Sequence, residues 1–152
     1  MSLTDYAWLA LAAYAAHILE EHAFDWRNWA RNVIGLPVEW SDFYVTNAVV
    51  VVLGIAQAGL SDSMTVAPLS FAALMLINAT FFHVLPVIKA KGRFSPGLVT
   101  AVVLFYPIGI AEFVHARAGT GEIILAFVIG AILMAFPIVC LKLKAWPYFR
   151  QS

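Results

Sequence analysis

Five long apolar segments dominate this chain and leave little sequence for anything else. They cover roughly Asp5 to Phe24, Phe43 to Leu60, Val66 to Ile88, Gly97 to His115 and Glu122 to Leu143. A helix needs about 20 mostly apolar residues to cross a hydrocarbon core of about 30 Å, whereas the strands of a membrane barrel alternate over about 10 residues. The sequence therefore predicts an all-α, multi-pass transmembrane helical bundle of about five spans, with residues 1–152 forming a single integral membrane domain.

The distribution of charge predicts how such a bundle is oriented. Hydrophobic residues make up 62% of the chain and charged residues 12%, which lies outside the range of soluble domains. In a five-span arrangement only Arg117 falls on one side, and the other basic residues share the opposite side: Arg27, Arg31, Lys89, Lys91, Arg93, Lys142, Lys144 and Arg150. The positive-inside rule then places the N-terminus outside and the C-terminus in the cytoplasm. We expect a bacterial cytoplasmic membrane protein with no nucleic-acid partner.

Ionisable residues interrupt the first span where they are costly. The run His17-Ile-Leu-Glu20-Glu21-His22 follows a stretch of alanine, leucine and tyrosine. On a helix of about 100° per residue, Glu20 lies about 60° to one side of His17 and Glu21 about 40° to the other, whereas His22 points about 140° away. A charged face inside a span is by default a functional-site hypothesis. We assign His22 to the membrane interface.

Other spans carry polar residues at a similar depth. With a rise of about 1.5 Å per residue, the side chains fall about 6 to 16 Å inside the cytoplasmic boundary; they are His17, Glu21, Asn47, Asn78, His83 and Thr100. If these faces meet, two imidazoles, two amides, a hydroxyl and the two carboxylates of Glu20 and Glu21 share one layer of the bundle.

Three interpretations compete for this layer. Two histidines and a carboxylate, His17, His83 and Glu21, are the minimal ligand set for zinc or a comparable divalent ion. In that case one glutamate binds the metal and the other activates a bound water. The second interpretation is a proton or ion relay, and the third is a hydrogen-bonded knot that holds helices together. Two adjacent carboxylates count against the third, because like charges repel in a low dielectric.

Local signals predict two further features of the cytoplasmic side. Aromatic and basic residues between Asp25 and Asp42 suit a short interfacial helix that Gly35 and Pro37 terminate. After the third span, Ser95 is predicted as the N-cap of the next helix, with Pro96 at its first position.

Three blocks of this sequence resemble the HXXEE family of small integral membrane proteins. They are His17-Ile-Leu-Glu20-Glu21, the segment from Asn78 to Pro86, and the segment from Arg93 to Thr100. Together they extend from the first span to the fourth. The resemblance implies a multi-span helical fold and a shared polar site, but no particular reaction.

We therefore expect a membrane-embedded, metal-dependent enzyme, hydrolase-like, that acts on a lipid or another lipophilic molecule near the cytoplasmic leaflet. His17, His83 and Glu21 are the expected zinc ligands, and Glu20 is the base or a fourth ligand. Asn47, Asn78 and Thr100 are expected to contact substrate. The alternatives are a proton- or ion-coupled transporter, which the absence of inverted repeats disfavours, and a non-catalytic lipid-binding subunit. A homodimer is compatible with each of these functions.

Overall fold

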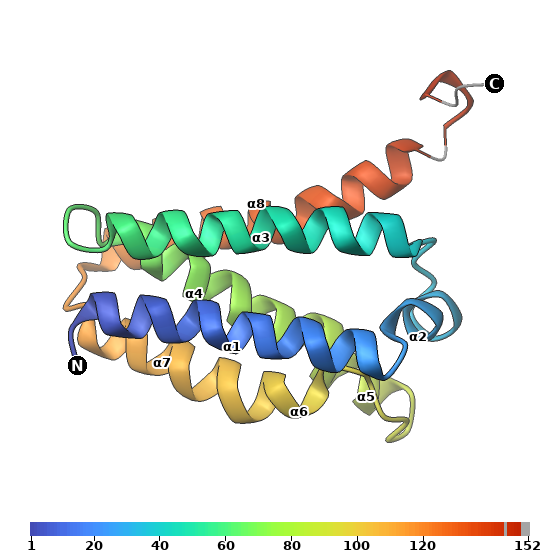
Figure 1. The fold of residues 1–152 in the computed structure, drawn as a ribbon, viewed down its shortest axis with the longest axis horizontal. Helices are drawn as coiled ribbons and strands as arrows, with labels where there is room; N and C mark the ends of the chain where they lie inside the picture. Colours follow the sequence, from blue (N-terminus) through green and yellow to red (C-terminus); the bar gives the residue numbers. More distant parts are fainter. Residues whose placement is uncertain (145, 150–152) are drawn as a thin grey trace.

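A computed structural model describes residues 1–144 and 146–149, and every regular element within them is helical. Figure 1 shows long helices lying side by side in one bundle. The elements are α1 (Leu3–Ala23), α2 (Trp26–Val33), α3 (Trp40–Leu60), α4 (Val66–Asn78), η1 (Ala79–Val84), α5 (Leu85–Lys89), α6 (Leu98–Thr100), η2 (Ala101–Phe105), α7 (Tyr106–His115), α8 (Thr120–Lys144) and η3 (Pro147–Phe149). The α4, η1 and α5 segments form one continuous helix, and α6, η2 and α7 form another. The predicted all-α fold is confirmed.

In the part of the chain that the structure describes, four helices are long and apolar enough to cross a membrane, which supports an integral membrane protein. They are Trp40–Leu60, Val66–Lys89, Leu98–His115 and Thr120–Lys144. The α1 helix is not among them, although it has 21 residues, because carboxylates and imidazoles interrupt it. Figure 1 nevertheless shows α1 running along the bundle beside α7. The count of five spans and the orientation stay predictions.

The α4 helix forms the centre of the bundle and contacts α8, α7, α3 and α1. Its residues 68–75 are all buried. The close approach of α8 depends on Gly130, where an added Cβ would lie 2.8 Å from the Cβ of Ala73. Small residues at a helix contact let two backbones approach and gain van der Waals packing, which is a main source of helix association in a membrane.

Within the described residues, two π-helical segments interrupt the long helices at the level of the polar layer. The η1 segment precedes Pro86, and the η2 segment precedes Pro107. A proline ring clashes with the carbonyl four residues earlier, which here belongs to Phe82 in η1 and to Val103 in η2. Widening that turn by one residue relieves the clash, and such π-bulges occur frequently at functional sites.

The short helix predicted between the first two apolar segments is present as α2, and ion pairs attach it to the start of α3. Arg27 and Arg31 both pair with Glu39, the N-cap of α3. Hydrogen bonds from the two guanidinium groups hold the pKa of the Glu39 carboxyl below its usual range. In Figure 1, α2, the α5–α6 connection and the end of α8 lie at the same end of the bundle. The basic residues on these elements therefore gather at one end; Arg150 lies outside the described residues.

Candidate metal centre

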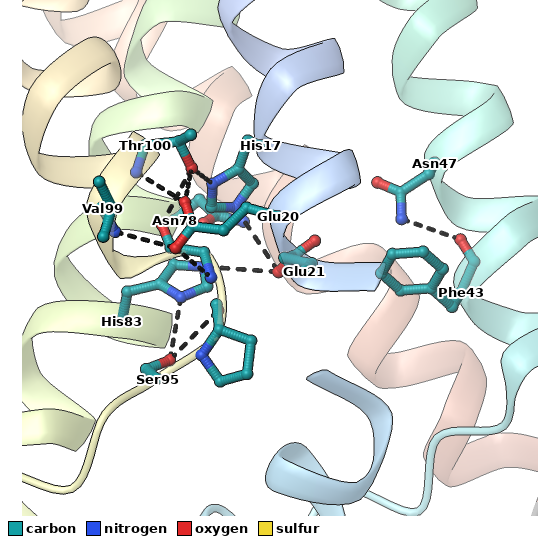
Figure 2. Close-up of polar contacts among 12 residues, drawn as sticks. His17, Glu20, Glu21, Phe43, Asn47, Asn78, His83, Ser95, Val99 and Thr100 are labelled. Atoms are coloured by element: carbon teal, nitrogen blue, oxygen red, sulfur yellow. Dashed lines mark hydrogen bonds and ion pairs between the residues drawn. The ribbon is translucent and has the colours of Figure 1, made fainter. Parts of the chain in front are cut away.

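Three buried side chains from two helices converge toward the basic end of the bundle. The Nε2 atoms of His17 and His83 each lie 3.5 Å from the same carboxylate oxygen, Oε1 of Glu21. Both histidines are fully buried and Glu21 is 5% exposed. Figure 2 shows the two imidazoles on one side of Glu21. We call His17, Glu21 and His83 the His–Glu cluster.

A hydrogen-bond chain sets the tautomer of His17. The Thr100 hydroxyl lies 2.6 Å from Oε2 of Glu20 and 2.8 Å from Nδ1 of His17. A carboxylate can only accept, so the hydroxyl donates its one proton to Glu20 and accepts from Nδ1–H of His17. The Nε2 atom of His17 is then left with a free lone pair that points at Glu21.

His83 is oriented in the same way by Ser95. The Ser95 hydroxyl donates to the carbonyl of Pro96 and lies 3.1 Å from Nδ1 of His83. It therefore accepts from Nδ1–H, and Nε2 of His83 also keeps its lone pair. The prediction that Ser95 is a helix N-cap is wrong, because the helix begins at Leu98 with Gly97 as its N-cap. The serine side chain is committed to His83 instead of the helix terminus.

The separation of the three ligand atoms suits a metal ion better than a hydrogen bond. The Nε2 atoms of His17 and His83 are buried and have no hydrogen-bond partner among the described residues. Their 3.5 Å separation from Glu21 exceeds the usual hydrogen-bond length of about 2.9 Å. Ligands about 2.1 Å from a tetrahedral zinc ion lie about 3.4 Å apart. All three candidate ligand atoms lie within 4.8 Å of one another.

Glu20 occupies a different position from Glu21. It accepts hydrogen bonds from the backbone amides of Gly97, Val99 and Thr100 and from the Thr100 hydroxyl. These amides are the unpaired donors at the start of the fourth long helix, where a negative charge is favoured. Both oxygens of Glu20 are therefore bonded to α6, whereas Glu21 is the carboxylate in the His–Glu cluster.

Gly97 closes the His–Glu cluster from the side of the α5–α6 loop. Its backbone is left-handed, with φ +92°. A Cβ at this position would lie 2.6 Å from Cε1 of His83, 2.7 Å from Cε1 of His17 and 3.0 Å from Cγ of Glu21. Only glycine meets both conditions without strain, so the loop backbone packs directly on both imidazoles.

The predicted substrate residues divide between two places. Thr100 contacts His17 and Glu20, as described. Asn47 and Asn78 line a cavity of about 80 Å³ between α1, α3, α4 and α8, which also reaches Glu21. The side-chain oxygen Oδ1 of Asn78 is buried without a hydrogen-bond partner in the described structure. The side-chain amide of Asn47, in contrast, donates to the backbone carbonyl of Phe43. The cavity has room for water or one small polar group.

The sequence-based reasoning missed two residues of this site. Ser95 was interpreted only as a helix cap, and Gly97 only as the first residue of a span. Both belong to the segment from Arg93 to Thr100 that carries the family resemblance, but a serine and a glycine have no metal-ligand signature of their own. Their roles depend on where the loop crosses the two histidines.

The sequence pattern of a family described as "Protein of unknown function with HXXEE motif" matches residues 8–111, more than half of the chain. No curated protein and no solved structure matches the chain. The matched range includes the His–Glu cluster and the residues that orient it.

Proposed function

The chain belongs to the HXXEE family, and we propose that it is a metal-dependent membrane enzyme whose ion, preferably zinc, is held by His17, Glu21 and His83. One observation carries this proposal: two buried imidazoles point unpaired Nε2 atoms at one carboxylate oxygen, each at 3.5 Å. Two imidazoles and a carboxylate are the ligands of many hydrolytic zinc sites. A metal-bound histidine typically donates its other ring N–H to a hydrogen-bond partner, as Nδ1–H of His17 does to Thr100 and Nδ1–H of His83 does to Ser95.

The arrangement supports a hydrolytic reaction. A zinc ion with three protein ligands keeps a position for water and lowers the pKa of that water to about 7. We assign proton transfer to the second oxygen of Glu21, since Glu20 is fully engaged at the start of α6. Glu20 is in this proposal a positioning residue that acts through Thr100 on His17. Asn78 offers an unpaired acceptor to a donor group of the substrate.

The alternative interpretations fit the geometry less well. A polar knot gains its stability from completed hydrogen bonds, but in the His–Glu cluster three lone pairs face one another with no donor between them. A proton relay requires a continuous chain at hydrogen-bond distance, and the chain that ends at Nε2 of His17 stops 3.5 Å short of Glu21. A cation satisfies all three atoms at once.

The predicted location follows from the basic end of the bundle. The His–Glu cluster lies toward that end, with His17 and Glu21 in the last two turns of α1. If the positive-inside rule holds here, the site faces the cytoplasmic leaflet of a bacterial membrane. We propose that the substrate reaches it from that leaflet as a lipid or another lipophilic molecule.

Elemental analysis of detergent-purified protein tests the metal centre. We expect one zinc or comparable divalent ion per chain in the wild type and none in the His17→Ala, His83→Ala double variant. His22→Ala is the matched control, because His22 lies on the same helix but is exposed and bonded to Tyr44. A wild type that is active without metal would overturn the proposal, as would equal metal content in all three proteins.

A further inference from the structure

A groove runs between α3 and the C-terminal half of α8. Its volume is about 440 Å³, which is within the size range of lipophilic ligand sites. Its walls are mostly apolar; they include Val49, Leu53, Leu133 and Phe136. Its cytoplasmic end holds an ion pair, with Nζ of Lys144 2.9 Å from Oδ1 of Asp42. We call this the α3–α8 groove.

Pro137 explains why the groove is open. It lies inside α8, where a proline removes one backbone hydrogen bond and clashes with the preceding turn, so the helix bends. Figure 1 shows the C-terminal part of α8 leaning away from the other helices. The α8 helix packs closely on α4 at Gly130 and separates from the bundle beyond the proline. The groove lies where the two parts diverge.

The groove has the length of one membrane leaflet. Its α3 wall extends from Ser41 to Leu53, a rise of about 18 Å at 1.5 Å per residue. Half of a hydrocarbon core is about 15 Å thick. The polar end lies at the basic end of the bundle and the apolar end near the middle. A lipid acyl chain in the cytoplasmic leaflet therefore matches the groove in length, direction and polarity.

The groove also adjoins the cavity at the His–Glu cluster. The residues Asp42, Thr46, Pro137 and Leu141 line both spaces. The junction is thus at the polar end of the groove, where the linkage between an acyl chain and its headgroup lies in a bilayer. From this junction the cavity leads past Asn47 to Glu21.

We propose that the α3–α8 groove binds one acyl chain of a glycerolipid from the cytoplasmic leaflet and presents its ester bond to the cavity beside Glu21. The second part rests on the proposed hydrolytic function. Hydrolysis adds water across the ester: the bond between the acyl carbon and the glycerol oxygen breaks. The hydroxyl of water joins the acyl carbon, and its proton joins the glycerol oxygen. The products are a fatty acid and a lysolipid, and no oxidant or reductant is required.

A bulky substitution in the groove tests where the lipid binds. Val49→Trp fills the groove from α3, and Ile55→Trp is the control, because Ile55 is equally exposed but lies about 120° around the helix from Val49. Each protein is incubated with equimolar 1-palmitoyl-2-oleoyl-phosphatidylglycerol and analysed by native mass spectrometry. We expect a one-to-one lipid complex for the wild type and Ile55→Trp, and roughly tenfold less complex for Val49→Trp.

A second measurement guards against a misfolded variant. Cys140 is the chain's one cysteine; it is exposed and lines the groove, so bound lipid should slow its alkylation by a maleimide in the unmodified protein. Three results would contradict lipid binding in the groove. They are an equal amount of lipid complex in all three proteins, an equal loss of complex in both tryptophan variants, and no protection of Cys140 by lipid. A protein dimer that Val49→Trp dissociates would instead assign it to a second copy of the chain.

The metal proposal fails separately. The His17→Ala, His83→Ala variant should retain the lipid complex but release no fatty acid or lysolipid. If the wild type holds no metal but Val49→Trp still loses the lipid complex, lipid binding in the groove is supported and the metal-dependent hydrolysis is refuted. If metal is present and Val49→Trp binds as much lipid as the wild type, only the proposal of lipid binding in the groove is refuted.

Discussion

Replacing Gly97 by alanine should disrupt the proposed metal centre although it replaces none of the ligands. The new methyl group would lie 2.6 Å from His83 and 2.7 Å from His17, so both rings must move by several tenths of an ångström or more. Metal sites tolerate ligand displacements of about 0.2 Å. We therefore expect Gly97→Ala to lose most of its bound metal, with affinity reduced by roughly tenfold to a hundredfold, the range seen when groups that orient metal ligands are removed.

The same substitution should also destabilise the fold by two separable contributions. A left-handed backbone costs a residue with a Cβ about 1 to 2 kcal/mol, and overpacking of a tight site costs typically about 1 to 3 kcal/mol. Gly92→Ala isolates the first contribution, because Gly92 has φ +87° but nothing within 4 Å of an added Cβ. Gly97→Ala should then be less stable than Gly92→Ala by about 1 to 3 kcal/mol.

Thermal unfolding in detergent and metal analysis of the two variants give the comparison. Gly92→Ala should keep the wild-type metal content with a small loss of melting temperature, and Gly97→Ala should lose both metal and further stability. Equal melting temperatures with full metal content in both variants would refute the packing of the loop backbone on the two histidines.

Three further predictions concern the residues around the ligands. Thr100→Val should weaken zinc binding by roughly 10- to 100-fold in a calorimetric titration, whereas Thr100→Ser, which keeps the hydroxyl, should bind as the wild type does; equal affinities would exclude the tautomer argument for His17. Glu20→Gln should lower the melting temperature even with a chelator present, because charge-assisted bonds of about 1.5 to 3 kcal/mol each are weakened. Glu21→Gln should lower the melting temperature only when zinc is present. The reverse pattern would make Glu20 the metal ligand and Glu21 the positioning residue. Finally, a chelator should lower the melting temperature of the zinc-loaded wild type, since zinc at 100 times its dissociation constant contributes about 2.7 kcal/mol, but leave the double histidine variant unchanged; a similar shift in both proteins would indicate a non-specific effect.

Much of this molecule could be predicted from apolar length and helix periodicity. The segments from Val66 to Ile88 and from Gly97 to His115 differ from the observed helices by one residue at one end each. The wheel of the first span placed His17 and Glu21 on one face, and these two residues do meet. The second result depends on regular α-helical geometry, which holds along α1.

The same reasoning fails where the helix is not regular. Asn78 and His83 are five residues apart, so an α-helix would turn their side chains about 140° away from each other. The η1 segment replaces this α-helical spacing with a wider turn. Residues before and after η1 therefore point in directions, relative to one another, that an α-helical wheel does not give. Pro86 indicates that the helix is irregular near this point, but it does not indicate that the irregularity is a π-helical turn. The partners of Glu20 were also beyond prediction, because they depend on how the α5–α6 loop crosses α1.

The attachment of Glu20 to the start of α6 has a consequence for biogenesis. The partner of Glu20 that is nearest in sequence is Gly97, 77 residues later in the chain. At about 5 to 20 residues per second, a ribosome needs roughly 4 to 15 s to synthesise that stretch. During this interval the Glu20 carboxylate lacks the donors that it has in the folded chain, and a charged group without partners is costly in lipid. If α1 spans the membrane, as the sequence predicts, we expect it to insert stably only after the fourth long helix has arrived.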